Sequence, residues 1–141
     1  MLPDAEQHSE GFRRTREVQR TALLEDYAEL IADLIDNGGE ARQVDIASRL
    51  GVSQPTVAKT LQRMIAEGLV VQKPYRGVFL SETGARLAEL SRDRHDTVET
   101  FLGALGVSAD TARIDAEGIE HHVSAETLEA FRRYLRKAKA R

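Results

Sequence analysis

The chain has 141 residues, of which 41% are hydrophobic and 30% are charged, and its formal net charge at pH 7 is -3. With only 3 prolines and 5% aromatic residues, this composition is typical of a helix-rich soluble protein of one or two small domains. The absence of cysteine excludes disulfides, thiolate metal ligands and thiol nucleophiles.

No apolar run approaches the roughly 18 residues that a membrane helix needs, and the polar N-terminus lacks the apolar core of a secretion signal. We therefore expect no membrane partner and a cytoplasmic location. Charge is unevenly distributed: residues 38–80 hold six basic and three acidic side chains, whereas residues 107–124 hold four acids and one arginine. The basic part can contact a polyanion although the whole chain is acidic.

Apolar spacing predicts a first helix that begins near Ser9 and ends at Asn37-Gly38-Gly39. Serines at positions 53, 81, 108 and 124 precede four further helices, at residues 54–67, 82–105, 109–122 and 125–139, and another helix is predicted at 43–50. Short β-prone runs at 69–72 and 78–80 predict a hairpin. The predicted fold is mostly α: a winged helix-turn-helix domain with a two-stranded wing at residues 10–81, followed by a helical domain at residues 82–141.

The order helix, turn, helix, hairpin is typical of a winged helix-turn-helix, and its sequence pattern lies between Ile46 and Val57. Gly51 can supply the positive φ of a tight turn, and small Ala47 lets two helices cross closely. The small core that fixes their crossing is predicted to consist of Ile46, Leu50, Val52, Val57 and Leu61.

The second helix of this motif is predicted to enter the major groove of DNA with its first residues against the bases. We assign base contacts to Gln54, Pro55 and Thr56, and anchoring to Ser53, Lys59, Arg63, Tyr75 and Arg76. Alternatively, these are ordinary surface residues of a three-helix fold that contacts proteins. The basic segment and the hairpin favour double-stranded DNA.

Carboxylates and histidines form two clusters at helical spacing. Asp26 and Glu29 share a face of the first helix, and Glu117, Glu120 and His121 share a face of the short acidic helix. His95 lies in the long helix, one turn before Glu99. Oxygen and imidazole ligands without sulfur suit a fairly hard divalent cation such as Mn²⁺, although such clusters can also be solvated helix faces. Gly118 within a predicted helix suggests that another backbone approaches closely there.

Several segments together resemble the diphtheria-toxin-repressor family, and more narrowly its manganese transport regulator branch: Glu25-Asp26-Tyr27-Ala28-Glu29, the helix-turn-helix, Tyr75-Arg76-Gly77-Val78-Phe79-Leu80, Arg94-His95 and Asp115-Ala116-Glu117-Gly118-Ile119-Glu120-His121-His122. The resemblance implies that the second domain serves dimerisation and metal binding. It also implies a site for two Mn²⁺ per subunit, built from Asp26, Glu29, His95, Glu117, Glu120 and His121. The iron-responsive branch carries Met in place of Asp26 and Cys in place of Glu117.

The implied function is that of a homodimeric, manganese-responsive DNA-binding regulator that represses manganese-uptake genes when metal is bound, other divalent metals activating less well. It is not an enzyme, and no organic ligand is expected. Three alternatives stay open: an iron-responsive repressor of the same family, a dinuclear carboxylate–histidine metallohydrolase, and a winged-helix regulator that responds to an organic ligand.

Overall fold

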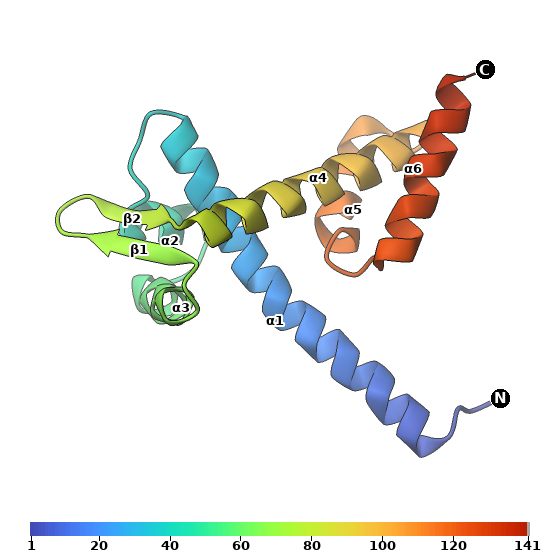
Figure 1. The fold of residues 1–141 in the computed structure, drawn as a ribbon, viewed down its shortest axis with the longest axis horizontal. Coiled ribbons are helices and arrows are strands. Elements are labelled where there is room, and N and C mark those ends of the chain that lie inside the picture. Colours follow the sequence, from blue (N-terminus) through green and yellow to red (C-terminus); the bar gives the residue numbers. More distant parts are fainter. Residues whose placement is uncertain (141) are drawn as a thin grey trace. The chain divides into compact units, whose positions relative to one another are not determined.

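The computed structural model describes residues 1–140 and contains six helices and two strands over that range (Figure 1). The elements are α1 (Ala5–Asp36), α2 (Gln43–Leu50), α3 (Gln54–Ala66), β1 (Val70–Lys73), β2 (Gly77–Leu80), α4 (Glu82–Ala104), α5 (Ala109–Ile119) and α6 (Ala125–Lys139). The chain forms two compact units. The winged unit is Leu23–Leu90, and the C-terminal unit comprises the chain from Ser91 together with Met1–Ala22. The predicted mostly α class with a two-stranded wing is confirmed.

The first helix begins at Ala5, four residues before Ser9, near which it was predicted to begin. The Asp4 carboxylate accepts a hydrogen bond from the backbone N–H of Gln7 at 2.9 Å, and the Asp4 carbonyl accepts one from His8 at 3.0 Å. Asp4 therefore caps the helix, and Ser9 lies inside it. Of the predicted serine caps, Ser53, Ser81 and Ser124 accept a backbone N–H, whereas the Ser108 side chain makes no capping bond.

The core of the winged unit joins α1 to the helix-turn-helix. Tyr27 and Ile31 of α1 are buried in one cluster with Ile46, Val57 and Met64. The predicted core is largely confirmed, because Ile46, Val57 and Leu61 are buried and Leu50 packs against them. The prediction for Val52 was wrong: it is 41% exposed, because it lies in the turn beyond Gly51.

The turn between α2 and α3 has the predicted geometry. Gly51 has a φ of 69°, in the left-handed region, and its N–H donates to the carbonyl of Ala47. The next N–H, that of Val52, bonds to the same carbonyl at 3.1 Å. Two backbone donors thereby close the end of α2, and α3 starts immediately afterwards at Gln54 with Pro55 in its first turn.

The wing is the antiparallel pair β1–β2, in which Val71 lies opposite Phe79 (Figure 1). A further bridge joins β2 to the segment before α2, since the Val78 N–H donates to the Ala41 carbonyl at 2.9 Å. Gly77 allows this approach: its φ is +82°, and a Cβ there would overlap the Ala41 carbonyl oxygen. The base of the wing is thus fixed to the helix-turn-helix.

The C-terminal unit packs the second part of α4 with α5 and α6 (Figure 1). Val98, Ala116 and Leu128, one from each helix, form its buried centre. Beside them, Phe101 stacks on Phe131 with ring centroids 4.0 Å apart. This small core fixes α5 against α4.

The short acidic helix ends earlier than predicted. The last helical residue of α5 is Ile119, and its carbonyl accepts hydrogen bonds from both His122 and Val123. Glu120 and His121 therefore lie in a turn after the helix. The close approach expected at Gly118 is not found within this subunit, because among the described residues no atom outside the local helix lies within 4 Å of the position of its Cβ. Among residues 1–140, no helix is long and apolar enough to cross a membrane.

We predict that Gly84→Ala will destabilise the winged unit by about 2 kcal/mol through overpacking. A Cβ at Gly84 would overlap the carbonyl oxygen of Leu69 and lie 3.2 Å from the Leu80 side chain. Gly103→Ala is the matched control in the same helix: nothing lies within 4 Å of its Cβ, and alanine favours helix by up to about 1 kcal/mol. Urea denaturation followed by circular dichroism measures both. Equal midpoints for the two variants would contradict the close approach.

Candidate metal centre and nucleic-acid interface

His95 of α4 is held in a defined orientation by a neighbour one turn later. Its Nε2 lies 3.0 Å from Oε2 of Glu99, and the His95 side chain is only 14% exposed. A carboxylate can only accept a hydrogen bond, so Nε2 carries the hydrogen, and in the neutral ring Nδ1 bears the lone pair. This contact gives His95 the carboxylate partner that metal-binding histidines usually have.

The other ring nitrogen of His95 faces two carboxylates. Nδ1 is buried and makes no hydrogen bond, while Oε1 of Glu120 lies 3.5 Å away and Oε1 of Glu117 lies 3.6 Å away. Ligand atoms that share one cation at bond lengths of about 2.1 Å lie about 3 to 3.5 Å apart. The spacing of these three atoms therefore fits a divalent cation.

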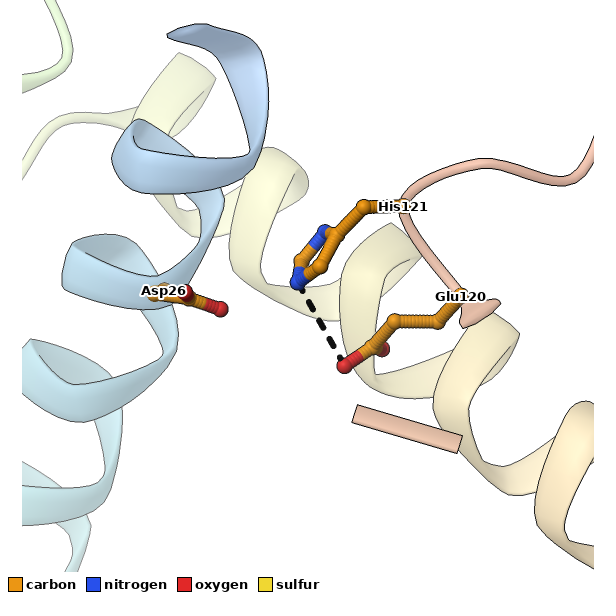
Figure 2. A group of neighbouring side chains, drawn as sticks. All are labelled: Asp26, Glu120 and His121. Carbon is orange, nitrogen blue, oxygen red and sulfur yellow. Dashed lines mark ion pairs between the residues drawn. The ribbon is translucent and has the colours of Figure 1, made fainter. Parts of the chain in front are cut away.

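Glu120 is the most deeply buried acid of this cluster. It is 1% exposed, and its Oε1 faces a second imidazole, with Nε2 of His121 at 3.6 Å (Figure 2). Oε1 is thus close to both imidazoles. Burial of a carboxylate is costly unless positive charge and hydrogen bonds compensate it. Both histidine side chains are largely buried as well, at 14% and 6% exposure, whereas Glu117 is 61% exposed and leaves one side of the cluster open to water.

The acids change the proton affinity of His95. Burial alone lowers the pKa of its imidazole, but the nearby carboxylates of Glu120, Glu117 and Glu99 outweigh burial, and the pKa is raised above its ordinary value. Surroundings that favour a proton on an imidazole also favour a metal cation. The site is therefore electrostatically suited to positive charge.

The structure assigns the six predicted metal ligands to different parts of the chain. His95, Glu117, Glu120 and His121 lie in the C-terminal unit. Asp26 and Glu29 lie on α1 in the winged unit, one turn apart and half-buried; Figure 2 labels Asp26 on its helix. Glu99 was not among the predicted ligands, although its i, i+4 spacing from His95 was visible in the sequence.

All eight residues predicted to contact DNA are exposed: Ser53, Gln54, Pro55, Thr56, Lys59, Arg63, Tyr75 and Arg76. The buried face of α3 holds Val57, Leu61 and Met64, which leaves the first turn of the helix open. Ser53 is partly engaged, since its Oγ accepts the Thr56 N–H at 3.2 Å. Arg63 lies 3.4 Å from Glu67 in an exposed ion pair, which solvent screens and a phosphate can replace.

Comparisons with known proteins identify both units. The family profile for the iron dependent repressor, N-terminal DNA binding domain, matches residues 20–78, and the profile for the iron dependent repressor, metal binding and dimerisation domain, matches residues 81–140. The transcriptional regulator MntR of Escherichia coli O6:H1 is 60% identical over 136 residues, which cover 96% of this chain and 88% of the relative.

Two solved structures share the fold. The manganese regulator SloR superimposes with a TM-score of 0.71 at 30% identity over 80% of this chain. A manganese-dependent transcriptional repressor in complex with manganese gives a TM-score of 0.72 at 29% identity over 79% of this chain. The chain spans about half the length of these two proteins, 53% and 52%.

The fold and the matched profiles define a winged-helix transcriptional regulator with a DNA-binding domain and a metal-binding and dimerisation domain. The chain belongs to the iron-dependent repressor family, also called the diphtheria-toxin-repressor family, and within it to the MntR branch. The family membership confirms that the chain is a regulator and not an enzyme, so the metallohydrolase alternative is not supported.

We predict that Glu99→Gln will weaken divalent-cation binding about 10- to 100-fold, because loss of a carboxylate partner to a ligating histidine has that effect in metal proteins. Isothermal titration calorimetry of the metal-free protein measures the affinity. Glu89→Gln, which removes an exposed acid from the same helix, should leave the affinity unchanged. An unchanged affinity for the Glu99 variant would contradict the orienting contact.

Proposed function

We propose that this chain is a manganese-responsive repressor, active in the cytoplasm as a homodimer on operator DNA. The observation that carries the proposal is the buried Nδ1 of His95, which faces the carboxylates of Glu117 and Glu120 at 3.6 Å and 3.5 Å. It is supported by 60% identity to regulators named MntR and by the fold shared with manganese regulators.

The proposed ligand set comprises His95, Glu117, Glu120 and His121, joined by Asp26 and Glu29 of α1. Carboxylate oxygens and imidazoles without sulfur match the preferences of Mn²⁺ better than those of softer cations. Six such residues provide enough donors for two Mn²⁺ per subunit, as the resemblance implies. Manganese binds weakest among the first-row divalent metals, so we expect selectivity to come from geometry, and other divalent metals to activate less well.

The mechanism depends on charge. When bound, the metal supplies positive charge to a group of acids that otherwise repel one another. Asp26 and Glu29 belong to α1, whose Tyr27 and Ile31 are buried in the core of the winged unit. Neutralising these acids together with Glu117 and Glu120 would tie the DNA-binding unit to the dimerisation unit. Metal shifts the population only by its differential affinity for the tied state.

The proposed partner is a two-fold operator. Once the two subunits are fixed, their α3 helices would lie about 34 Å apart, one turn of DNA. Gln54, Pro55 and Thr56 would contact bases, and Ser53, Lys59, Arg63, Tyr75 and Arg76 would anchor the backbone. We retain residues 10–81 as the DNA-binding domain and 82–141 as the dimerisation and metal-binding domain. By the resemblance to manganese transport regulators, the repressed genes would encode proteins for manganese uptake.

We predict that DNA binding requires manganese. Duplexes are first selected from a random-sequence library with the Mn²⁺-loaded protein, and gel shifts at fixed salt then compare Mn²⁺, Fe²⁺, Zn²⁺ and chelator. The affinity with Mn²⁺ should exceed that with chelator by at least about tenfold, within the usual range of coupling between two ligands. Binding that is indifferent to Mn²⁺ and to chelator would favour a regulator that responds to an organic ligand.

A ligand exchange tests the choice between manganese and iron. In Asp26→Met with Glu117→Cys, two oxygen ligands become sulfur, so the DNA-binding response should move from Mn²⁺ towards Fe²⁺ under anaerobic conditions. The control, Asp110→Met with Glu126→Cys, changes two exposed acids outside the proposed ligand set and should keep the manganese response. The same response in the ligand variant as in the parent would count against the assignment of Asp26 and Glu117.

A further inference from the structure

The tip of the wing holds an aromatic side chain in an unusual backbone conformation. Tyr75 has a φ of 64°, and among residues 1–140 it is the only non-glycine residue with a positive φ. Its side chain is 94% exposed, so no packing of the ring accounts for the conformation. Residues other than glycine rarely adopt a positive φ unless the surrounding structure constrains the backbone.

One constraint on Tyr75 is local: the Arg76 N–H donates to the Lys73 carbonyl at 3.2 Å and closes a turn in which Tyr75 is the second central residue, a position that can require a positive φ. A second contact comes from Arg42, at the N-cap position of α2. Nη2 of Arg42 donates a hydrogen bond to the Tyr75 carbonyl at 3.0 Å, across 33 residues of sequence. The same guanidinium is fixed by Glu40, whose Oε2 accepts from Nε at 2.8 Å and from Nη2 at 2.6 Å. A planar guanidinium can hold several acceptors in one geometry, and here it ties the wing tip to the start of the helix-turn-helix.

The cations of the wing are also held in place. Nζ of Lys73 lies 4.6 Å from the centroid of the Phe79 ring, and the Arg76 guanidinium carbon lies 5.3 Å from it. Arg76 is also 3.8 Å from Oε1 of Glu40. Cation–π contacts of this kind restrict long basic side chains while leaving their charge accessible. The surface formed by Lys73, Tyr75 and Arg76 is here termed the wing tip. It is basic, because the nearby acid, Glu40, is already paired with Arg42.

We propose that Arg42 is a positioning residue for DNA binding, which presets the wing tip against the phosphate backbone. This inference rests on the proposed function. A basic surface with a projecting tyrosine suits phosphate and sugar contacts, which come from Arg, Lys and Tyr side chains in protein–DNA complexes. The guanidinium lowers the ordering cost of binding, because the tip is held in its exposed conformation before DNA arrives.

A double-mutant cycle tests the proposal with the full-length protein, Mn²⁺ and a duplex selected by the parent from a random-sequence library. Fluorescence anisotropy should show Arg42→Met binding about tenfold more weakly, a loss typical of coupled neighbours. In a background in which all three side chains of the wing tip are replaced (Lys73→Met, Tyr75→Ala and Arg76→Met), the same change should cost less than about twofold, because Arg42 acts through these side chains. Equal losses in both backgrounds would mean that Arg42 contacts DNA independently, and no loss in either would mean that it has no role; both overturn the proposal.

Hydrogen–deuterium exchange provides a second readout that needs no DNA. Arg42→Met should speed exchange in the wing segment at residues 73–78, while peptides from α3 keep the parent rate and show that the unit is folded. In Arg42→Lys, which keeps the charge but loses the planar guanidinium, the exchange rate of the wing should lie between those of the parent and of Arg42→Met. Unchanged exchange in the wing overturns the positioning role. If the parent itself fails to bind any selected duplex, the proposed function fails, whereas the exchange result still decides whether Arg42 constrains the wing.

Discussion

A buried carboxylate at the start of the α5–α6 turn is the constraint on which the sensing half of this protein depends. Glu120 is 1% exposed, and its Oε1 lies within 3.6 Å of both His95 and His121. A charge in this position is tolerable only when positive charge compensates it. Arg94 lies within electrostatic reach of Glu120, imidazoles add positive charge when protonated, and the pKa of His95 is raised because the surrounding acids outweigh burial. The same electrostatics suits the cluster to the divalent cation proposed above, and metal sensing would then follow from the cost of burying the acid.

The DNA-binding half uses charge in the opposite way. Its candidate contacts on α3 and the wing are exposed, and Glu67, the ion partner of Arg63, is exposed too. Such pairs contribute little to stability and exchange readily with phosphate. Order in this half comes from the backbone: the left-handed Gly51 sets the turn, and the bridge from Ala41 to Val78 fixes the wing. The cluster around Glu120 therefore depends on buried charge, whereas the DNA-binding unit depends on a rigid backbone that presents solvated side chains.

The sequence predicted the elements and their order because caps, glycines and apolar spacing are local signals, and Ser53, Gly51 and Ser124 act as expected. It failed where a neighbour decides the outcome. Ser9 resembled a cap, but Asp4 has that role five residues earlier, and α5 ends at Ile119, whose carbonyl accepts hydrogen bonds from the following turn. Helical spacing paired Glu117 with Glu120, yet the approach of both to Nδ1 of His95 depends on how α5 packs on α4. Only the resemblance to a family supplied that pairing in advance. The Arg42 bond to Tyr75 spans 33 residues and leaves no local pattern.

Helix α1 explains how a small binding event could reach the DNA-binding surface. Asp26 adjoins Tyr27, which is 1% exposed in the core shared with Ile46 and Val57. A displacement of α1 at Asp26 would therefore reach the core through Tyr27, since close-packed interiors transmit displacement instead of absorbing it. If Asp26 and Glu29 belong to the metal-ligand set, the metal would act on the winged unit directly, through helix α1. The winged unit would then respond as a rigid body, and the response would require no rearrangement within α2 or α3.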